Sequence, residues 1–162
     1  MRKHKKKHKK KQTKNTEGIM YGNMDNKVKH LEMIENIIQR MANNSFQLKG
    51  WAVTLVGVIG AFASQGSDKR FFLLAFVPLI AFWFLDSFYL LLERKYKVMY
   101  KNVSDKAEEE IDFSMDLGGI TATGDDVNRL CYGRCLFSRT EAWFYLPIMA
   151  AVIVLAIILI WT

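Results

Sequence analysis

Cysteine and histidine are scarce in this chain of 162 residues, which contains two cysteines and three histidines. Cys131 and Cys135 are separated by three residues, whereas the paired cysteines of zinc sites and redox motifs are separated by two. No second cysteine pair is present, and the histidines fit no ligand set with this one; they are His4, His8 and His30. The sequence therefore predicts no metal site.

The motifs of common catalytic sites are also missing. The chain has no glycine-rich phosphate loop, no nucleophile elbow and no metalloprotease motif. Four aspartates of one glycine-containing segment do not have the spacing of a calcium loop, and we interpret that segment as an acidic, solvated loop; they are Asp112, Asp116, Asp125 and Asp126. We therefore expect no enzymatic activity, no cofactor and no catalytic residue.

Two long segments are nearly devoid of charge, in a chain where charged residues make up 24%. Residues 71–92 include a single charged side chain, Asp86, and residues 142–162 include none. Each segment exceeds the roughly 18 apolar residues that indicate a membrane helix, and each can cross about 30 Å of hydrocarbon. Both segments are therefore predicted to be membrane spans.

A third apolar segment, residues 46–64, is less distinct because Gln47 and Lys49 lie in its first turn. Read alone, it could be a buried helix of a soluble protein. Because only the short stretch 65–70 separates it from the next span, we interpret residues 46–92 as a transmembrane helical hairpin. The predicted fold class is thus all-α, an integral membrane protein with three transmembrane helices and cytoplasmic amphipathic helices, with two spans as the alternative.

Basic residues are distributed unevenly around these spans. Residues 1–49 hold 13 of the 23, residues 93–141 hold 8, and the turn at 65–70 holds 2. Basic residues mark the cytoplasmic side of a membrane protein. We therefore expect the N-terminus and residues 93–141 in the cytoplasm, and the turn and the C-terminal residue Thr162 outside.

Lys49 and Asp86 are charged residues within the hairpin. They are equally far along the chain from the centre of the turn, so antiparallel helices place them at the same depth. An aspartate in lipid costs about 2.5 to 3.5 kcal/mol on insertion scales, so it needs a partner or a function. We predict that Asp86 pairs with Lys49. The alternatives are that Lys49 extends to the headgroups while Asp86 faces a protein interior or water, or that Asp86 lies on the path of a proton or an ion.

Two amphipathic segments flank the hairpin on the cytoplasmic side. In residues 24–45 the apolar side chains recur at three- and four-residue spacing, which predicts a helix; they are Val28, Leu31, Ile34, Ile37, Ile38 and Met41. Beyond the second span the same pattern continues to about Glu109, at Tyr96, Tyr100, Val103 and Ala107. We expect the two helices to pack together, within one chain or between subunits; a position of residues 24–45 on the membrane surface is the alternative.

The first 23 residues have no such periodicity and carry nine lysine or arginine residues within the first 14. Repulsion within a run of like charges predicts disorder. The tail could bind anionic lipid, at about 1 kcal/mol per basic residue, or only reinforce the topology. We do not expect nucleic acid as a partner. Met20 and Met24 are alternative translation starts, and the organised sequence begins at Met24.

Four stretches of the chain resemble a group of small, uncharacterised bacterial membrane proteins with three helices: "HLEMIENIIQRMANNSFQLKGWAVTLV", "FWFLDSFYLLLERKYKVMY", "DFSMD" and "LFSRT". The resemblance covers most of residues 24–162 and is most specific in the first two stretches. These contain our candidate site residues, Lys49, Trp51 and Asp86. The resemblance implies a bacterial inner-membrane protein, brings no established activity, and suggests a place among bacterial defence genes.

We therefore expect a non-enzymatic inner-membrane protein that contacts the lipid bilayer and assembles with itself or with a cytoplasmic protein. The sharper form of this hypothesis is a defence effector, in which a signal received by residues 24–45 and 93–141 rearranges the spans and perturbs the membrane. Two alternatives are an accessory subunit that tethers a soluble enzyme and a transporter of a small solute or ion.

Reporter proteins fused to the chain test the predicted topology. A fusion at residue 115 should be active only as a cytoplasmic reporter, and a fusion at residue 162 only as an external one, because basic residues hold the first position inside. A cytoplasmic C-terminus would mean that one apolar segment does not span, with residues 46–64 as the first candidate.

Overall fold

The computed structural model describes the backbone of residues 2–65 and 69–161, and the side chains of residues 25–63, 65, 72–158 and 161. In this part of the chain every regular element is a helix, so the all-α prediction is confirmed. Three α-helices are long: α1 (Arg2–Ser64), α2 (Phe76–Asp105) and α5 (Arg139–Trp161). The others are short: η1 (Lys69–Ala75), η2 (Glu108–Glu110), η3 (Leu117–Gly119), α3 (Asp125–Arg129) and α4 (Tyr132–Leu136).

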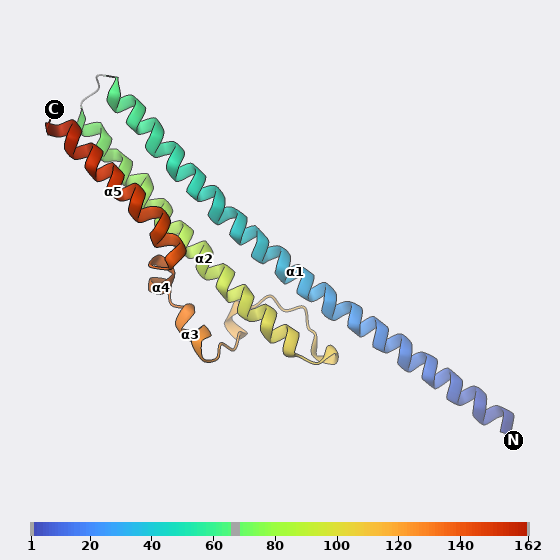
Figure 1. Cartoon of the computed structure of the whole chain (residues 1–162). Coiled ribbons are helices and arrows are strands. Elements are labelled where there is room, and N and C mark those ends of the chain that lie inside the picture. The colour runs from blue at the N-terminus through green and yellow to red at the C-terminus, as the bar shows by residue number, and fades with distance from the viewer. Residues whose placement is uncertain (1, 66–68, 162) are drawn as a thin grey trace.

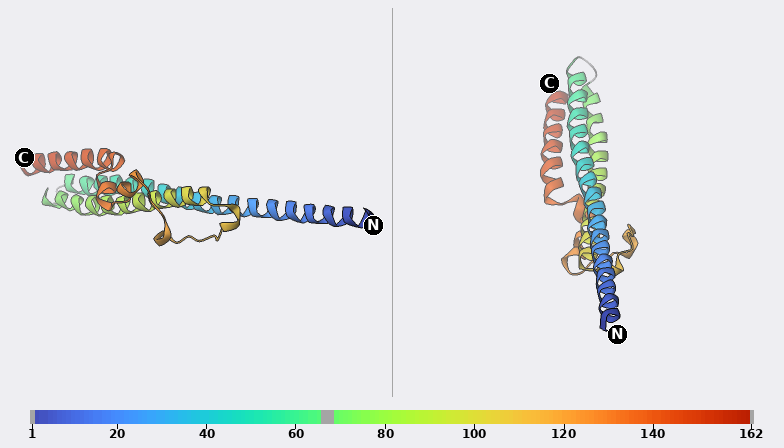
Figure 2. Two further views of the ribbon diagram at one scale, coloured as in Figure 1. Left: turned by 90° about the horizontal axis from the view of Figure 1, so that it is seen from below. Right: turned by 90° about the vertical axis from the view of Figure 1, so that its right-hand side faces the viewer.

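The long helices lie side by side over the half of the molecule that contains the C-terminus (Figures 1 and 2). α1 and α2 form the antiparallel hairpin that the sequence predicts, and α5 runs back beside them toward the hairpin's turn. The irregular segment between α2 and α5 lies along the other half of α2 (Figure 1). The hairpin and α5 therefore form a three-helix bundle at one end, and the hairpin continues beyond this bundle at the other.

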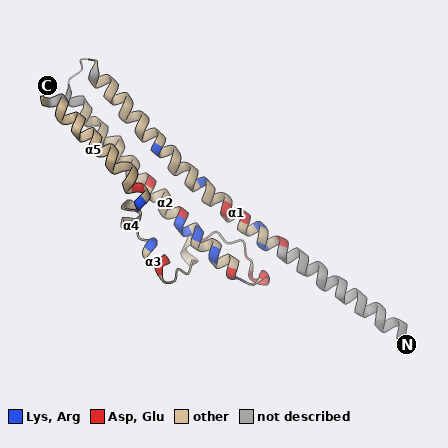
Figure 3. Ribbon diagram, in the orientation of Figure 1, with Lys and Arg blue, Asp and Glu red and all other residues tan. Residues whose placement is uncertain are grey.

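Three helical segments are long and apolar enough to cross a membrane: Asp25–Ala63, Phe72–Asp105 and Arg139–Ile158. Among the described residues, charged ones are sparse in the half of the molecule with α5 and gather beyond it, along α1, α2 and the loop (Figure 3). Within the bundle, large apolar side chains point outward, and Phe62, Val77 and Trp143 are 64%, 66% and 77% exposed. Apolar surface of this extent marks a site of interaction with a membrane or a partner.

Small side chains let the bundle helices approach closely. Ala52, Ala63, Ala75 and Ala156 are all buried where the helices meet. Small residues at such contacts allow close backbone packing, which is the main source of attraction between helices in lipid. Larger side chains fill the remaining space, at Phe72, Leu79, Tyr145 and Val152. The apolar residues of this bundle are thus divided between a tight interior and an exposed outer surface.

α1 differs from the sequence prediction because it is one continuous helix from Arg2 to Ser64. We expected a disordered tail over residues 1–23 and a separate amphipathic helix at 24–45. Lysine, glutamine and methionine are good helix formers, and no proline occurs before Pro78, so no residue interrupts the helix. The amphipathic segment and the first predicted span are therefore two parts of one rod.

The two amphipathic segments that flank the hairpin pack together within one chain, which is one of the two arrangements that we expected. Ile34 of α1 is fully buried against Met99 and Val103 of α2. The loop beyond α2 contributes further apolar contacts, from Ile111, Met115, Leu117 and Ile120. α2 ends at Asp105 rather than near Glu109, and residues 108–110 form the separate turn η2. We call residues 25–45, 93–105 and the loop 106–124 the arm.

The burial of Ile34 allows a prediction of how a cavity at this position would affect the stability of the arm. Ile34→Ala should cost about 2 to 5 kcal/mol of local stability, because it removes a fully buried side chain. Faster hydrogen exchange of the amides around Met99 and Val103 would show this loss. Met33→Ala is the matched control, since Met33 is 48% exposed on the same helix. Equal exchange in the two variants would contradict the packing.

Candidate functional site: a buried charge cluster

The ion pair predicted between Lys49 and Asp86 is present at the end of the bundle that adjoins the arm. Lys49 Nζ of α1 contacts Asp86 Oδ2 of α2. The Asp86 side chain is fully buried, and that of Lys49 is 17% exposed. Lys49 Nζ also lies 3.0 Å from Ser45 Oγ, one turn earlier on α1. The equal spacing of the two residues from the turn thus brought them into register.

A second carboxylate, which the sequence analysis did not single out, completes the contacts of Lys49. Glu141 Oε1 of α5 lies 3.1 Å from Lys49 Nζ, and the Glu141 side chain is 1% exposed. Lys49 therefore connects all three long helices through a single ammonium group. Breaking such a buried pair by removing one partner is strongly destabilising, because a charge is left in a dry environment.

Tyr145 closes the cluster from α5. Its hydroxyl donates to Asp86 Oδ2 over 3.0 Å, and its ring is fully buried. The ring stacks on Trp83 of α2, with centroids 6.0 Å apart, and the ammonium of Lys49 lies 5.8 Å from the centroid of Phe144. Aromatic faces attract cations, so these rings stabilise Lys49 as well as excluding water. We call Lys49, Asp86, Glu141 and Tyr145 the charge cluster.

The sequence contains a signal that could have identified Glu141. Ser138 and Glu141 have the spacing of a capping box, in which a serine precedes a helix and a glutamate lies three residues later. The Glu141 backbone N–H lies 3.4 Å from Ser138 Oγ, and α5 begins at Arg139. We predicted the last span to begin at residue 142, which left Glu141 in the loop. Beginning it at Arg139 places Glu141 and Tyr145 on one helical face, four residues apart.

Short helix α4 holds the base of α5 against α2. Trp83 Nε1 donates to the Leu136 carbonyl over 3.0 Å, and the Tyr132 hydroxyl donates to the Phe84 carbonyl over 2.9 Å. Cys135 of α4 is fully buried, and this burial raises the pKa of its thiol. Arg94 lies beside it, with Nη1 3.4 Å from Cys135 Sγ. These contacts fix the position from which Glu141 reaches Lys49.

Trp51, the third candidate residue, lies apart from the cluster. Its side chain is 61% exposed on the outer surface of α1. Two residues along an α-helix correspond to a rotation of about 200°, so Trp51 and Lys49 face in nearly opposite directions. The structure therefore joins two of the three predicted residues, and Trp51 is suited to contact lipid.

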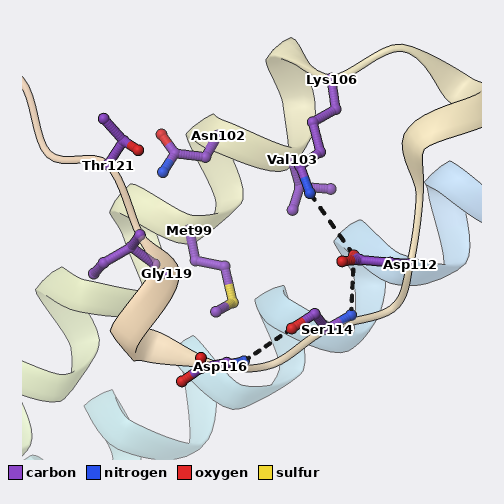
Figure 4. Close-up of a pocket in the computed structure, with 10 residues that line it drawn as sticks. Met99, Asn102, Val103, Lys106, Asp112, Ser114, Asp116, Gly119 and Thr121 are labelled. Atoms are coloured by element: carbon purple, nitrogen blue, oxygen red, sulfur yellow. Dashed lines mark hydrogen bonds and ion pairs between the residues drawn. The ribbon is translucent and has the colours of Figure 1, made fainter.

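A pocket of about 260 Å³ lies in the arm between the end of α2 and the loop (Figure 4). Asp112 Oδ1 accepts a hydrogen bond from the Ser114 backbone N–H and lies 3.7 Å from Lys106 Nζ. The Ser114 N–H, with a contribution from Lys106, lowers the pKa of Asp112. Asp116 accepts a hydrogen bond from the Gly118 backbone N–H over 2.8 Å. Both carboxylates thus stabilise turns of the loop itself.

Comparisons of the chain with models of known protein families, with curated proteins and with solved structures find no match. The charge cluster and the arm are therefore interpreted from their own geometry.

The charge cluster predicts unequal costs for its three charged residues. Lys49→Met should be the most destabilising substitution, by about 3 to 5 kcal/mol, because it leaves two buried carboxylates without a cation. Asp86→Asn should cost less, since Glu141 still pairs with Lys49. Adding Asp86→Asn to Lys49→Met should restore part of the loss. Reversible unfolding in bicelles measures these free energies.

Lys97→Met serves as the control for this series, because Lys97 is 59% exposed and pairs with Glu93 one turn away. Its effect should lie within a few tenths of a kcal/mol, as for other exposed pairs. Strictly additive effects of Lys49→Met and Asp86→Asn would show that the two side chains do not interact.

Proposed function

We propose that this chain is a non-enzymatic integral membrane protein of the bacterial inner membrane that assembles with itself or with a cytoplasmic protein through its arm. Three helices long and apolar enough to cross a membrane support the membrane location. The exposed apolar side chains of the bundle would contact lipid acyl chains. The bacterial origin rests on the resemblance of the hairpin stretches to small bacterial membrane proteins.

The distribution of charge supports an orientation with the arm in the cytoplasm. Charged residues gather on the arm and the adjoining loop, while they are sparse in the bundle (Figure 3). The charge cluster would lie just inside the hydrocarbon boundary, since Asp86 precedes Leu92, the end of the apolar segment, by roughly 9 Å of helix. The turn near Ser64 and the end of α5 would then face outward.

The observation that carries this proposal is that α1 passes from the arm into the bundle as one helix, with Lys49 at the junction. A partner that moves residues 25–45 would therefore move Lys49 relative to Asp86 and Glu141. Packed helices have discrete arrangements rather than a continuous range. Binding at the arm would thus change the packing of the spans, and in the sharper hypothesis this change perturbs the membrane.

Two other functions are compatible with the same architecture. A tether would use the arm to hold a soluble enzyme at the membrane without any change in the bundle. A transporter would need a continuous polar path, and intramembrane polar groups other than the charge cluster are few among the described residues. The coupling of the arm to the cluster through α1 favours the effector over both.

Induced expression in bacterial cells separates these functions. An effector should lower the membrane potential, followed with a voltage-sensitive dye, and Lys49→Met should alter the onset because it releases the three helices from one another. Arg134→Met, at an exposed residue of α4 outside the arm and the charge cluster, should behave as the wild type.

An inserted chain that leaves the membrane potential unchanged would contradict the effector and favour the tether. Currents that require Asp86 but not Lys49 would favour the transporter.

A further inference from the structure

The charge cluster contains an unequal number of positive and negative groups. Lys49 provides one positive charge, whereas Asp86 and Glu141 would provide two negative charges if both were ionised. Their side chains are 0% and 1% exposed, respectively. An uncompensated charge away from water is strongly unfavourable. The cluster therefore requires one more positive charge than its ion pairs supply.

Two carboxylate oxygens show where this charge is needed. Asp86 Oδ1 and Glu141 Oε2 are buried, and neither has a hydrogen-bond partner in the described structure. The two carboxyl groups come close to each other because both contact the same nitrogen, Lys49 Nζ. An ionised carboxylate can only accept hydrogen bonds, whereas a protonated one can also donate. A single proton would both neutralise the excess charge and supply the missing donor.

The neighbouring groups do not provide this charge. Tyr145 donates its only hydroxyl proton to Asp86, and Ser45 is a neutral partner of Lys49. Cys135 of α4 lies near Glu141 as a buried thiol with a raised pKa. Arg94, on the other side of Cys135, donates to the Arg129 carbonyl over 3.0 Å and to Cys135 Sγ. The Arg94 guanidinium thus contacts the Arg129 carbonyl and Cys135 rather than Asp86 or Glu141.

We propose that the charge cluster is a proton-binding site in which Asp86 and Glu141 share one proton at neutral pH beside the ammonium of Lys49. Binding forms one O–H bond and removes one negative charge, and no other bond changes. Two carboxylates at close range commonly hold one proton between them, because like charges cannot both remain ionised there. This site is independent of the proposed membrane-perturbing function, since it requires only the packed bundle.

Lys49 occupies the place between the carboxylates that a metal ion would need, so the ligand is a proton. Lys49 is also the partly exposed member of the cluster, with 17% of its side chain exposed, so the proton can enter and leave along this side chain. When the proton leaves at higher pH, the cluster retains a net negative charge. The packing of α5 against α1 and α2 should therefore weaken as the pH rises through the loss of this proton.

Infrared difference spectroscopy of the full chain in lipid vesicles tests the proposal directly. At pH 7 the wild type should show the C=O stretching band of one protonated carboxylic acid per chain, shifted in heavy water. Asp86→Asn and Glu141→Gln should each lack the band, because the remaining carboxylate is ionised and paired with Lys49. Glu109→Gln, at an exposed residue of η2, should keep it.

The wild-type spectrum is decisive even if a variant fails to fold. A wild type without the band at pH 7, or a band that persists in Asp86→Asn or Glu141→Gln, would overturn the proposal. A band that appears in choline buffer but disappears in sodium buffer would show a metal ion in place of the proton and would also overturn it. Depolarisation of cells is a separate readout, so failure of the proposed function leaves this test intact.

Discussion

The architecture depends on one buried ammonium group. Lys49 reaches carboxylates from two other helices, so a single side chain links α1, α2 and α5. The apolar contacts of the bundle are weakly directional, and in lipid they do not by themselves determine how far one helix slides along another. A charge in a dry environment has few acceptable positions, because any slip that separates it from its partners leaves it unpaired. The charge cluster therefore sets the register of the bundle.

The same cluster marks the boundary between two kinds of packing. On one side, small residues such as Ala52 and Ala156 bring the helices together, and large apolar side chains face outward. On the other side, the arm buries Ile34 and Met99 beneath a loop and exposes charged side chains such as Lys29 and Lys97. Because α1 runs through both parts, a displacement in the arm is transmitted to Lys49. The arrangement connects a surface suited to protein contact with a bundle suited to lipid.

Much of the helical bundle and part of the charge cluster could be predicted from the sequence, because the relevant signals are local. The near absence of charge identifies residues 71–92 and 142–162 as long apolar helices, and equal spacing from a turn pairs Lys49 with Asp86. The interaction with Glu141 could not be obtained in this way, since it depends on how α5 returns to the hairpin after an irregular segment. The start of α5 was nevertheless encoded in the sequence, because Ser138 and Glu141 have the spacing of a capping box.

Other features could not be predicted from the spacing of apolar residues. The continuity of α1 depends on the absence of proline rather than on the presence of a pattern, whereas charge repulsion in the tail led us to expect disorder there. Trp51 was selected because it lies in a stretch with a strong resemblance, but its exposed side chain faces away from the charge cluster. A resemblance identifies a region, and the helical rotation decides which of its residues meet.

Solid-state nuclear magnetic resonance in bilayers tests the central claim most directly. With ¹⁵N in the lysine side chain and ¹³C in the carboxyl groups, dipolar couplings should connect Lys49 Nζ to the carboxyl carbons of both Asp86 and Glu141. The expected separation corresponds to the 3.1 Å between Lys49 Nζ and Glu141 Oε1. Coupling of Lys49 Nζ to lipid phosphate ³¹P, with none to either carboxyl carbon, would contradict the account.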